Sequence, residues 1–320
     1  MRFSPVPRDS ISGEVAIVTG GSRGFGLELA RELGRNGCRL VICARDPLEL
    51  MRARDALRDE DVQVTTVTCD ITSEDAPQLL IDAALEAYGR LDILVNNAGV
   101  IQVGPAEQVT FGDIEVAMAI MALAPARLAL AVLPVLREHG GGRIVNVTSV
   151  GGKISVPHLL PYSMAKFAAL AFSEGLRAEL GTGPVTVTTA VPGLMRTGSH
   201  VQALFRGQRE KEFTWFSLGA SLPLVSMDAE RAARRVVSAM RARQAEVILT
   251  PAAQVAARGA AVFPGLTARV LHLMSGLLPD PASSAAPIAQ GKELRPAMGS
   301  GLFGKLTALG RAASRRLNQA

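Results

Sequence analysis

The chain has 320 residues, of which 48% are hydrophobic and only 4% aromatic, so it can bury a sizeable core of aliphatic side chains. The formal net charge is +5, and residues 291–320, with six basic side chains and one acidic one, account for all of it. This distribution excludes a basic nucleic-acid-binding face on the main domain and confines the excess charge to a tail.

The cysteines and the N-terminus point to a reducing compartment. Cys38, Cys43 and Cys69 have no metal-ligand spacing, so we expect free thiols, a cytoplasmic location and no metal site. The leader segment, residues 1–12, lacks the apolar core of a signal peptide. No run of about 18 uninterrupted apolar residues occurs, so a membrane-spanning helix is not expected.

Short β-branched runs alternate with longer helical stretches from Glu14 to Pro251. The predicted strands are 15–19, 39–44, 62–69, 93–96, 143–147, 185–190 and 246–249. The predicted helices between them are 26–36, 48–58, 74–88, 111–138, 161–180 and 229–241. This alternation predicts a doubly wound parallel α/β sheet, a Rossmann fold, formed by a single domain over residues 13–251.

Three regions depart from the alternation. Residues 194–226 follow the sixth strand, at the edge of the sheet where doubly wound folds bind ligands, and we interpret them as a substrate lid. Residues 252–278 form an apolar helical extension. Residues 279–320 are a Pro/Ala/Ser-rich linker followed by a basic tail, expected to be flexible.

The first strand runs into a glycine-rich loop that opens a helix, Thr19-Gly20-Gly21-Ser22-Arg23-Gly24-Phe25-Gly26. Glycines let a backbone approach phosphate groups closely, and the free N–H groups at a helix start attract negative charge. We therefore expect a dinucleotide to contact this loop at Gly20, Ser22, Arg23, Gly24 and Gly26. The alternative is a plain tight turn.

Charge at the end of the second strand indicates which dinucleotide binds. An acidic residue there favours NAD, whereas arginine favours the 2′-phosphate of NADP. The strand ends at Arg45, and the glycine loop adds Arg23, so we predict NADP(H). Asp46 is a counter-signal, and a solvated strand end is the alternative for Arg45.

A tyrosine, a lysine and a serine suggest proton-transfer chemistry. Tyr162 and Lys166 lie four residues apart in a predicted helix, which places them on one face. A nearby ammonium lowers the pKa of a phenol and makes it a better acid–base group at neutral pH. Ser149 ends the fifth strand, so its side chain is expected at the ligand-binding edge of the sheet.

Together these motifs resemble the short-chain dehydrogenase/reductase family over about residues 13–251. The shared features, in order, are Thr-Gly-x-x-x-Gly-x-Gly, Asn96-Asn97-Ala98-Gly99, Ser149, Tyr162-x-x-x-Lys166 and Pro192-Gly193. The resemblance implies that Ser149 orients a carbonyl, Tyr162 transfers the proton, and Lys166 holds the ribose and tunes the tyrosine. It further implies cofactor contacts from four more residues, namely Asp70, Asn97, Gly99 and Thr197.

One position departs from the family pattern. Most members carry an asparagine in the long fourth helix that completes a water-mediated proton relay, and this sequence aligns Met121 there. A thioether does not replace the hydrogen bonds of an amide. Pro125 lacks an N–H, so the carbonyl of Met121 is free to hold the relay water instead. The alternatives are a shifted alignment or a methionine that belongs to the core.

We therefore expect an NADP(H)-dependent oxidoreductase that interconverts a ketone or aldehyde and the matching alcohol. One alternative is a catalytically weak NADP-binding regulator, motivated by Met121, although the intact Ser149, Tyr162 and Lys166 argue against it. Another is a 3-oxoacyl thioester reductase whose lid binds an acidic carrier protein. Its basic residues would be Arg206, Arg209 and Lys211.

The predicted partners follow from the lid and the C-terminal region. An apolar lid suits a bulky hydrophobic small molecule, and the residues concerned are Phe205, Phe213, Trp215 and Phe216. The tail has leucines at helical spacing among arginines, which is typical either of peripheral membrane contact or of a disordered solubilising tail. The extension at 252–278 can cover a substrate mouth, form an oligomer interface or meet lipid. Family resemblance implies a homo-oligomer.

Overall fold

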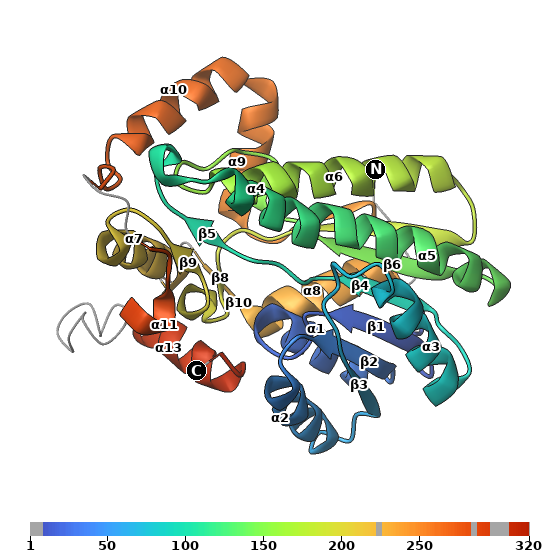
Figure 1. Cartoon of the computed structure of the whole chain (residues 1–320). Coiled ribbons are helices and arrows are strands. Elements are labelled where there is room, and N and C mark those ends of the chain that lie inside the picture. The colour runs from blue at the N-terminus through green and yellow to red at the C-terminus, as the bar shows by residue number, and fades with distance from the viewer. Residues whose placement is uncertain (1–8, 222–225, 283–286, 295–306, 320) are drawn as a thin grey trace.

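A seven-stranded parallel sheet forms the centre of the computed structural model, which describes residues 9–221, 226–282, 287–294 and 307–319. The strand order is β11-β7-β6-β4-β1-β2-β3, and every neighbouring pair is parallel. Figure 1 labels β6, β4, β1, β2 and β3 of this sheet. The strands are β1 (Val15–Thr19), β2 (Arg39–Ala44), β3 (Val64–Thr68), β4 (Ile93–Asn96), β6 (Gly142–Val147), β7 (Val185–Val191) and β11 (Glu246–Ile248). The predicted doubly wound α/β fold is confirmed.

Helices cover both faces of this sheet and build two apolar clusters with it. On one face lie α1 (Gly24–Arg35), α2 (Pro47–Arg58) and α8 (Ala229–Arg241). On the other lie α3 (Ala76–Tyr88), α5 (Ala124–Glu138) and α6 (Leu160–Leu180). Because the strands are buried on both faces, they are continuous apolar runs in the sequence, as parallel strands usually are.

The predicted helix 111–138 is interrupted in its middle. α4 (Phe111–Met118) leads into a π-helical turn, η2 (Ala119–Leu123), before α5 begins. The N–H of Ala124 reaches back five residues to the carbonyl of Ala119, and Pro125 has no N–H to offer the carbonyl of Met121. The most apolar 18-residue window of the segment Phe111–Glu138 has a mean hydropathy of 2.1, as a membrane-crossing helix would, but half of that window is buried, as in a core helix.

The segment expected as a lid, 194–226, folds around an aromatic core. It contains β8 (Met195–Arg196), η4 (Ser199–Val201), β9 (Leu204–Phe205) and α7 (Arg209–Ser221). Phe205, Phe213 and Phe216 are buried, and Phe205 meets the other two rings edge to face. Two small sheets, β10-β8 and β12-β9-β5, bind the segment to the rest of the chain through β5 (Gln102–Val103), β10 (Met227–Asp228) and β12 (Ala289–Gln290).

A helical hairpin follows the last strand of the large sheet. α9 (Pro251–Val262) begins at Thr250, whose hydroxyl accepts a hydrogen bond from the N–H of Ala253. α10 (Pro264–Ser275) projects from the domain (Figure 1), and none of its residues is buried. The extension expected at 252–278 therefore has an uncovered apolar surface, made of Val262, Phe263, Leu266, Val270, Leu273, Met274 and Leu277.

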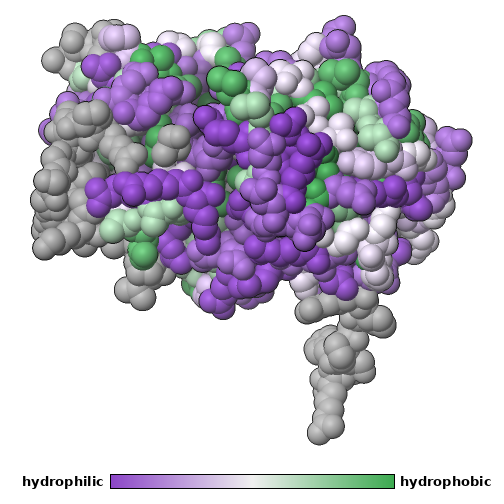
Figure 2. Space-filling view, turned by 90° about the horizontal axis from the view of Figure 1, so that it is seen from below, coloured by the Kyte–Doolittle hydropathy of each residue, from purple (hydrophilic) through white to green (hydrophobic). Residues whose placement is uncertain are grey.

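The tail differs from the flexible segment expected over 279–320, in the residues that the structure describes. α11 (Gly291–Leu294) and α13 (Ala308–Arg316) pack against α7, and Leu317 is fully buried. The domain covers the apolar side of α13 at Ala313, whereas Arg315 and Arg316 are exposed. The surface on the side of α2 and α13 is mostly hydrophilic (Figure 2). These contacts leave little of α13 free to meet lipid.

Parts of the leader and the tail lie outside the described residues, namely 1–8, 295–306 and 320. Asp9, at the start of the described chain, pairs with Arg143 and Arg243. Two short 3-10 turns complete the elements, η1 (Ala106–Gln108) and η3 (Val150–Gly152). Within the described ranges, no group of three or more His, Cys, Asp or Glu side chains is arranged to hold a metal ion.

Candidate active site

The glycine loop joins β1 to α1 at the carboxyl edge of the sheet. Gly20 and Gly24 have φ angles of +64° and +58°, a backbone conformation that other residues rarely adopt. Gly26 lies against the carbonyl of Gly20, where a Cβ atom has no room. The loop therefore requires all three glycines, and it presents the first-turn N–H groups of α1 at the edge where α/β folds bind ligands.

The Asn-Asn-Ala-Gly run holds this loop in place. The hydroxyl of Thr19 accepts hydrogen bonds from the N–H groups of Asn97 (2.9 Å) and Ala98 (3.1 Å). The Asn97 amide donates to the carbonyl of Thr19 (3.0 Å). Gly99 is exposed and faces the sulfur of Met121. Two motifs almost eighty residues apart therefore form one structural unit beside the predicted dinucleotide site.

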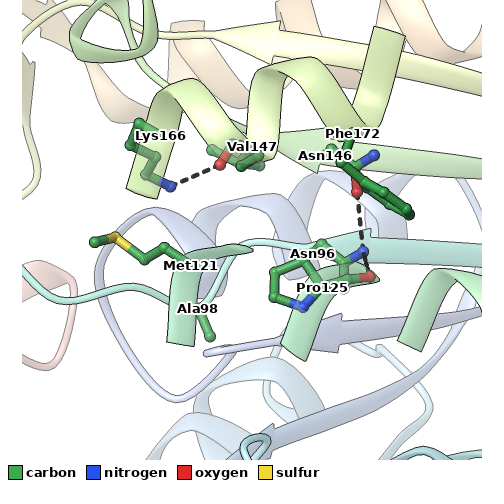
Figure 3. Close-up of a pocket in the computed structure, with 9 residues that line it drawn as sticks. Asn96, Ala98, Met121, Pro125, Asn146, Val147, Lys166 and Phe172 are labelled. Atoms are coloured by element: carbon green, nitrogen blue, oxygen red, sulfur yellow. Dashed lines mark hydrogen bonds between the residues drawn. The ribbon is translucent and has the colours of Figure 1, made fainter. Parts of the chain in front are cut away.

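The structure brings Ser149, Tyr162 and Lys166 together. Ser149 follows β6, and its hydroxyl accepts a hydrogen bond from the N–H of Gly151 (3.0 Å). Tyr162 lies in the first turn of α6 with its ring against Gly151. The Nζ atom of Lys166 is 5.9 Å from the centre of that ring and donates to the carbonyl of Val147 at 2.8 Å (Figure 3). The predicted catalytic residues thus share one site.

Burial controls the titration of the two ionisable groups in this trio. It raises the pKa of Tyr162, and a hydrogen bond with Ser149 opposes part of that rise. Burial also lowers the pKa of Lys166 from 10.5 to about 8. The phenol therefore remains protonated at neutral pH in these surroundings, while the ammonium of Lys166 is close to titration.

Two further predicted contacts lie after β3 and β7. The carboxylate of Asp70 accepts hydrogen bonds from the N–H and the hydroxyl of Thr72, and these bonds lower its pKa. Thr197 is buried, and its hydroxyl accepts from the N–H of Ser199 at 3.3 Å. Both side chains therefore stabilise their own loops, and their contacts with a nucleotide stay predictions.

Comparison with known proteins decides the family. A family model described as short chain dehydrogenase matches residues 14–205, which include the glycine loop, Ser149, Tyr162 and Lys166. The chain belongs to the short-chain dehydrogenase/reductase family. It is an oxidoreductase that interconverts a carbonyl and an alcohol with NAD(P)(H) as cofactor.

Three proteins show what this short-chain dehydrogenase/reductase is similar to. A Streptomyces coelicolor protein named "Putative ketoacyl reductase" is 37% identical over 190 residues, 58% of this chain and 71% of that protein. A short-chain dehydrogenase/reductase from Burkholderia phymatum, solved with NAD, has a TM-score of 0.74 at 26% identity, covering 81% and 96% of the two chains. Actinorhodin polyketide ketoreductase, solved with NADPH, has a TM-score of 0.64 at 30% identity, covering 76% and 97%.

The residues around the adenosine side fit a dinucleotide but do not by themselves separate NAD from NADP. Arg45 is exposed after β2. Arg23 pairs with Glu49 at 2.6 Å, and the hydroxyl of Ser22 donates to the same carboxylate at 3.2 Å. Asp46, the counter-signal in the sequence, accepts hydrogen bonds from the first turn of α2 and acts as its N-cap.

A small cavity lies below Lys166 (Figure 3). About 10 Å³ of it admits the centre of a water molecule, close to the smallest space that holds one water. The Asn96 amide donates to the carbonyl of Pro125 and to Asn146, but its own Oδ1 is buried with no partner among the described residues. Met121 also lines this space, and its side chain packs with Ala117, Ala165 and Tyr162. The site is suited to one ordered water.

Sequence reasoning missed two contributors to this site. Glu49 neutralises Arg23, and its place four residues after Arg45, in the first turn of α2, was a signal that could have been read. Asn318 donates to the carbonyls of Ser22 and Glu49. Nothing in the local sequence links positions almost three hundred residues apart, so this contact comes only from the fold.

Proposed function

We propose that this enzyme is an NADP(H)-dependent reductase of a hydrophobic ketone or aldehyde, with Tyr162 as the proton donor. The observation that supports this most is the convergence of Ser149, Tyr162 and Lys166 beside the glycine loop and the Asn97 unit. Three side chains of suitable chemistry from two elements meet at the edge of the sheet where ligands bind.

Each side chain has a separate role in this proposal. The bound nicotinamide supplies the hydride. The hydroxyl of Ser149 donates a hydrogen bond to the carbonyl oxygen and orients it. The phenol of Tyr162 gives its proton to that oxygen as the alcohol forms, and the ammonium of Lys166 stabilises the phenolate left behind.

Burial favours the protonated form of Tyr162 that reduction requires. Reduction needs a protonated phenol at the start of the reaction, and burial of Tyr162 raises its pKa and maintains that form at neutral pH. The reverse oxidation needs the phenolate, which the same surroundings disfavour. We therefore infer that reduction runs over a broader pH range than oxidation.

The deciding experiment follows NADPH consumption at 340 nm over a panel of ketones, aldehydes and β-keto thioesters. The wild type should turn over at least one class, and Tyr162→Phe should abolish that turnover. Tight NADPH binding with no turnover anywhere on the panel would favour the alternative of a binding-only regulator and reject the reductase.

The NADP preference rests on two arginines in different settings. Arg45 is exposed, whereas Arg23 must leave Glu49, or share its charge with it, to bind a 2′-phosphate. KM for NADPH and NADH should differ in favour of NADPH in the wild type and shift toward NADH in Arg45→Asp. A wild type that prefers NADH would overturn this preference.

The preference for a hydrophobic substrate rests on the walls beside Tyr162. Tyr162 packs against the aromatic cluster of the lid, which also includes Trp215. Substrates with bulky apolar groups should therefore show the lowest KM on the panel. Small polar ketones reduced with equal kcat/KM would contradict this expectation.

A 3-oxoacyl thioester is the second candidate substrate, because the Streptomyces coelicolor relative is named as a ketoacyl reductase. The lid offers limited positive charge to an acidic carrier protein. Arg206 pairs with Asp113, and Arg209 donates to the carbonyl of Pro287, whereas Lys211 is exposed. Weak turnover of free thioester analogues that improves when a carrier protein bears them would support this candidate.

A further inference from the structure

Residues 317–319, the last that the structure describes, lie against the glycine loop. The N–H of Gly24 donates to the carbonyl of Leu317 at 2.8 Å. The side-chain amide of Asn318 donates to the carbonyls of Ser22 (2.9 Å) and Glu49 (3.0 Å). The carboxamide oxygen of Asn318 accepts from Arg52 on α2 at 3.0 Å. One asparagine therefore joins the glycine loop to the start of α2, the two segments beside the adenosine ribose site proposed above.

The C-terminal residues pack closely against the loop, as their burial and the positions of two glycines show. Leu317 is fully buried and Gln319 is 6% exposed. A side chain at position 24 would collide with the amide of Gln319, and one at position 198 would collide with Ser314. Gly24 and Gly198 both have positive φ angles, so the chain turns sharply where the C-terminal segment fits against it.

The same segment also reaches the lid. The amide of Gln202, just after η4, donates to the carbonyl of Gln319 at 3.2 Å. Gly310 packs against Ser221 at the end of α7 and against His200 in η4. Residues 307–319 therefore connect the glycine loop to the segment that follows Thr197, the residue predicted to contact the nicotinamide.

We propose that residues 307–319 are a C-terminal strap that positions the dinucleotide site, with Asn318 as its principal positioning residue. The proposal rests on the proposed cofactor binding. The strap holds the Ser22–Arg23 backbone against α2, so the phosphate-facing loop keeps one conformation before the cofactor arrives. Preorganisation of this kind lowers the conformational cost of binding.

The geometry favours a positioning role over occupation of the cofactor site. Asn318 binds backbone carbonyls, whereas the Ser22 hydroxyl and the Arg23 guanidinium, the groups predicted to contact the cofactor, face Glu49. Carbonyls do not bind phosphate, so the bonds of Asn318 use other atoms of the loop than a phosphate does. The carbonyl of Leu317 occupies the N–H of Gly24, a predicted cofactor contact, and it must release that N–H when a phosphate binds there. The strap can therefore stay attached through Asn318 while the cofactor displaces Leu317 from Gly24.

The test is dinucleotide affinity measured by NADPH fluorescence on the full-length chain. Asn318→Ala removes both donor bonds, and Asn318→Asp keeps only the acceptor for Arg52. Loss of two hydrogen bonds from the loop should weaken NADPH binding about five- to twentyfold in both variants. Leu309→Ala, on the exposed side of α13, is the matched control and should bind as the wild type does.

Kinetics separate this role from a general loss of structure. In Asn318→Ala, KM for NADPH should rise by about the same factor as the Kd. With NADPH saturating, kcat should stay within twofold of the wild type, roughly, because Asn318 does not touch the reacting groups. A fall in kcat with unchanged KM, or wild-type affinity in both Asn318 variants, would overturn the strap. Tighter NADPH binding in the variants would also overturn it and would show that the tail competes with the cofactor.

Failure of the strap and failure of the proposed reaction give different results. A wild type that binds NADPH but reduces nothing rejects the reductase, yet the Asn318 variants still report on the strap through affinity. Conversely, an active reductase whose affinity does not depend on Asn318 rejects the strap alone.

Discussion

At the residue scale, the site combines a buried acid with a buried cation whose surroundings shift them in opposite directions. Burial raises the pKa of Tyr162 and lowers that of Lys166 to about 8. Of these two groups, Lys166 is thus the one whose charge changes nearer to neutral pH. Lys166 therefore controls the pH dependence of the site more directly than Tyr162 does.

This difference predicts the pH profile of the free enzyme. kcat/KM for NADPH should be level below about pH 8 and fall about tenfold per pH unit above it, because Lys166 then loses the charge that holds the ribose and stabilises the phenolate. Rates in overlapping buffers from pH 6 to 10 measure it. A level profile through pH 10 would mean that Lys166 stays charged or is not needed.

A second prediction concerns the ion pair of Arg23 and Glu49, beside the position proposed for the 2′-phosphate. Glu49→Gln releases Arg23 and removes a negative charge, so the preference for NADPH over NADH should increase about fivefold, a typical effect of a partly exposed ion pair. The ratio of kcat/KM values for the two cofactors measures it. Glu60→Gln breaks a comparable pair with Arg31 and should leave that ratio unchanged. An unchanged ratio in Glu49→Gln would show that Arg23 does not select the cofactor.

At the scale of single elements, we propose that the break between α4 and α5 compensates for a missing side chain. The π-helical turn contains Met121, the residue that the sequence analysis aligned with the family's relay asparagine, and the cavity beside it is lined by Met121, Pro125 and Lys166. The side-chain oxygen of Asn96 is buried and has no hydrogen-bond partner among the described residues. Backbone geometry at a π turn can thus supply an acceptor that the thioether of Met121 does not offer.

Pro125→Ala tests this relay. It returns an N–H to the helix, and we expect the carbonyl of Met121 to be recaptured and kcat to fall several-fold, roughly, as for a weakened proton-transfer step. Pro134→Ala is the matched control, since Pro134 also lies inside α5 but away from the cavity. Full activity in Pro125→Ala would reject the relay and leave Met121 as a core residue.

The hairpin of α9 and α10 is the better candidate for the membrane contact predicted from the C-terminal region. Leu273 on α10 is 72% exposed and Leu277, just after α10, is 86% exposed, whereas the domain covers Ala313 and Leu317 of the tail. Flotation with anionic vesicles should therefore decrease in Leu273→Asp and Leu277→Asp. Leu309→Asp on α13 should float as the wild type does. Equal flotation of all variants would rule out lipid contact at α10 and leave an oligomer or substrate role for it.

At the scale of the whole molecule, a second uncovered apolar surface runs along the outer sides of α4, α5 and α6. Its exposed residues are Phe111, Val116, Leu123, Leu130, Leu160, Met164 and Phe167. A surface of this kind on a globular domain usually marks a protein interface. It provides a physical basis for the homo-oligomer that the family resemblance implies.

The predicted homo-oligomer can be tested by introducing one charged side chain into this apolar surface. Phe167→Glu should lower the mass measured by light scattering from that of an oligomer to that of a smaller species, because a buried unpaired carboxylate is costly at an interface. Leu79→Glu, at a partly exposed leucine on α3 outside this surface, should keep the wild-type mass. A wild type that has the mass of a monomer would contradict the prediction of a homo-oligomer.

The sequence by itself determined the fold class and the limits of the seven strands of the large sheet to within two residues, and it predicted that Ser149, Tyr162 and Lys166 share one site. Those features depend on local patterns, since alternating β-branched and helical runs and a four-residue spacing are properties of neighbouring residues. The conformation of the glycine loop was readable for the same reason, because Gly20 and Gly24 need positive φ angles.

Only the tertiary structure decided the features that join distant segments. The pairing of Glu49 with Arg23, the burial that shifts Lys166, and the contact of Asn318 with Ser22 all depend on which elements pack together. From the sequence, the apolar side of the tail could contact a membrane or belong to a disordered segment. In the structure it packs against α7 instead. Burial and long-range hydrogen bonds are properties of the packed chain, so no local pattern encodes them.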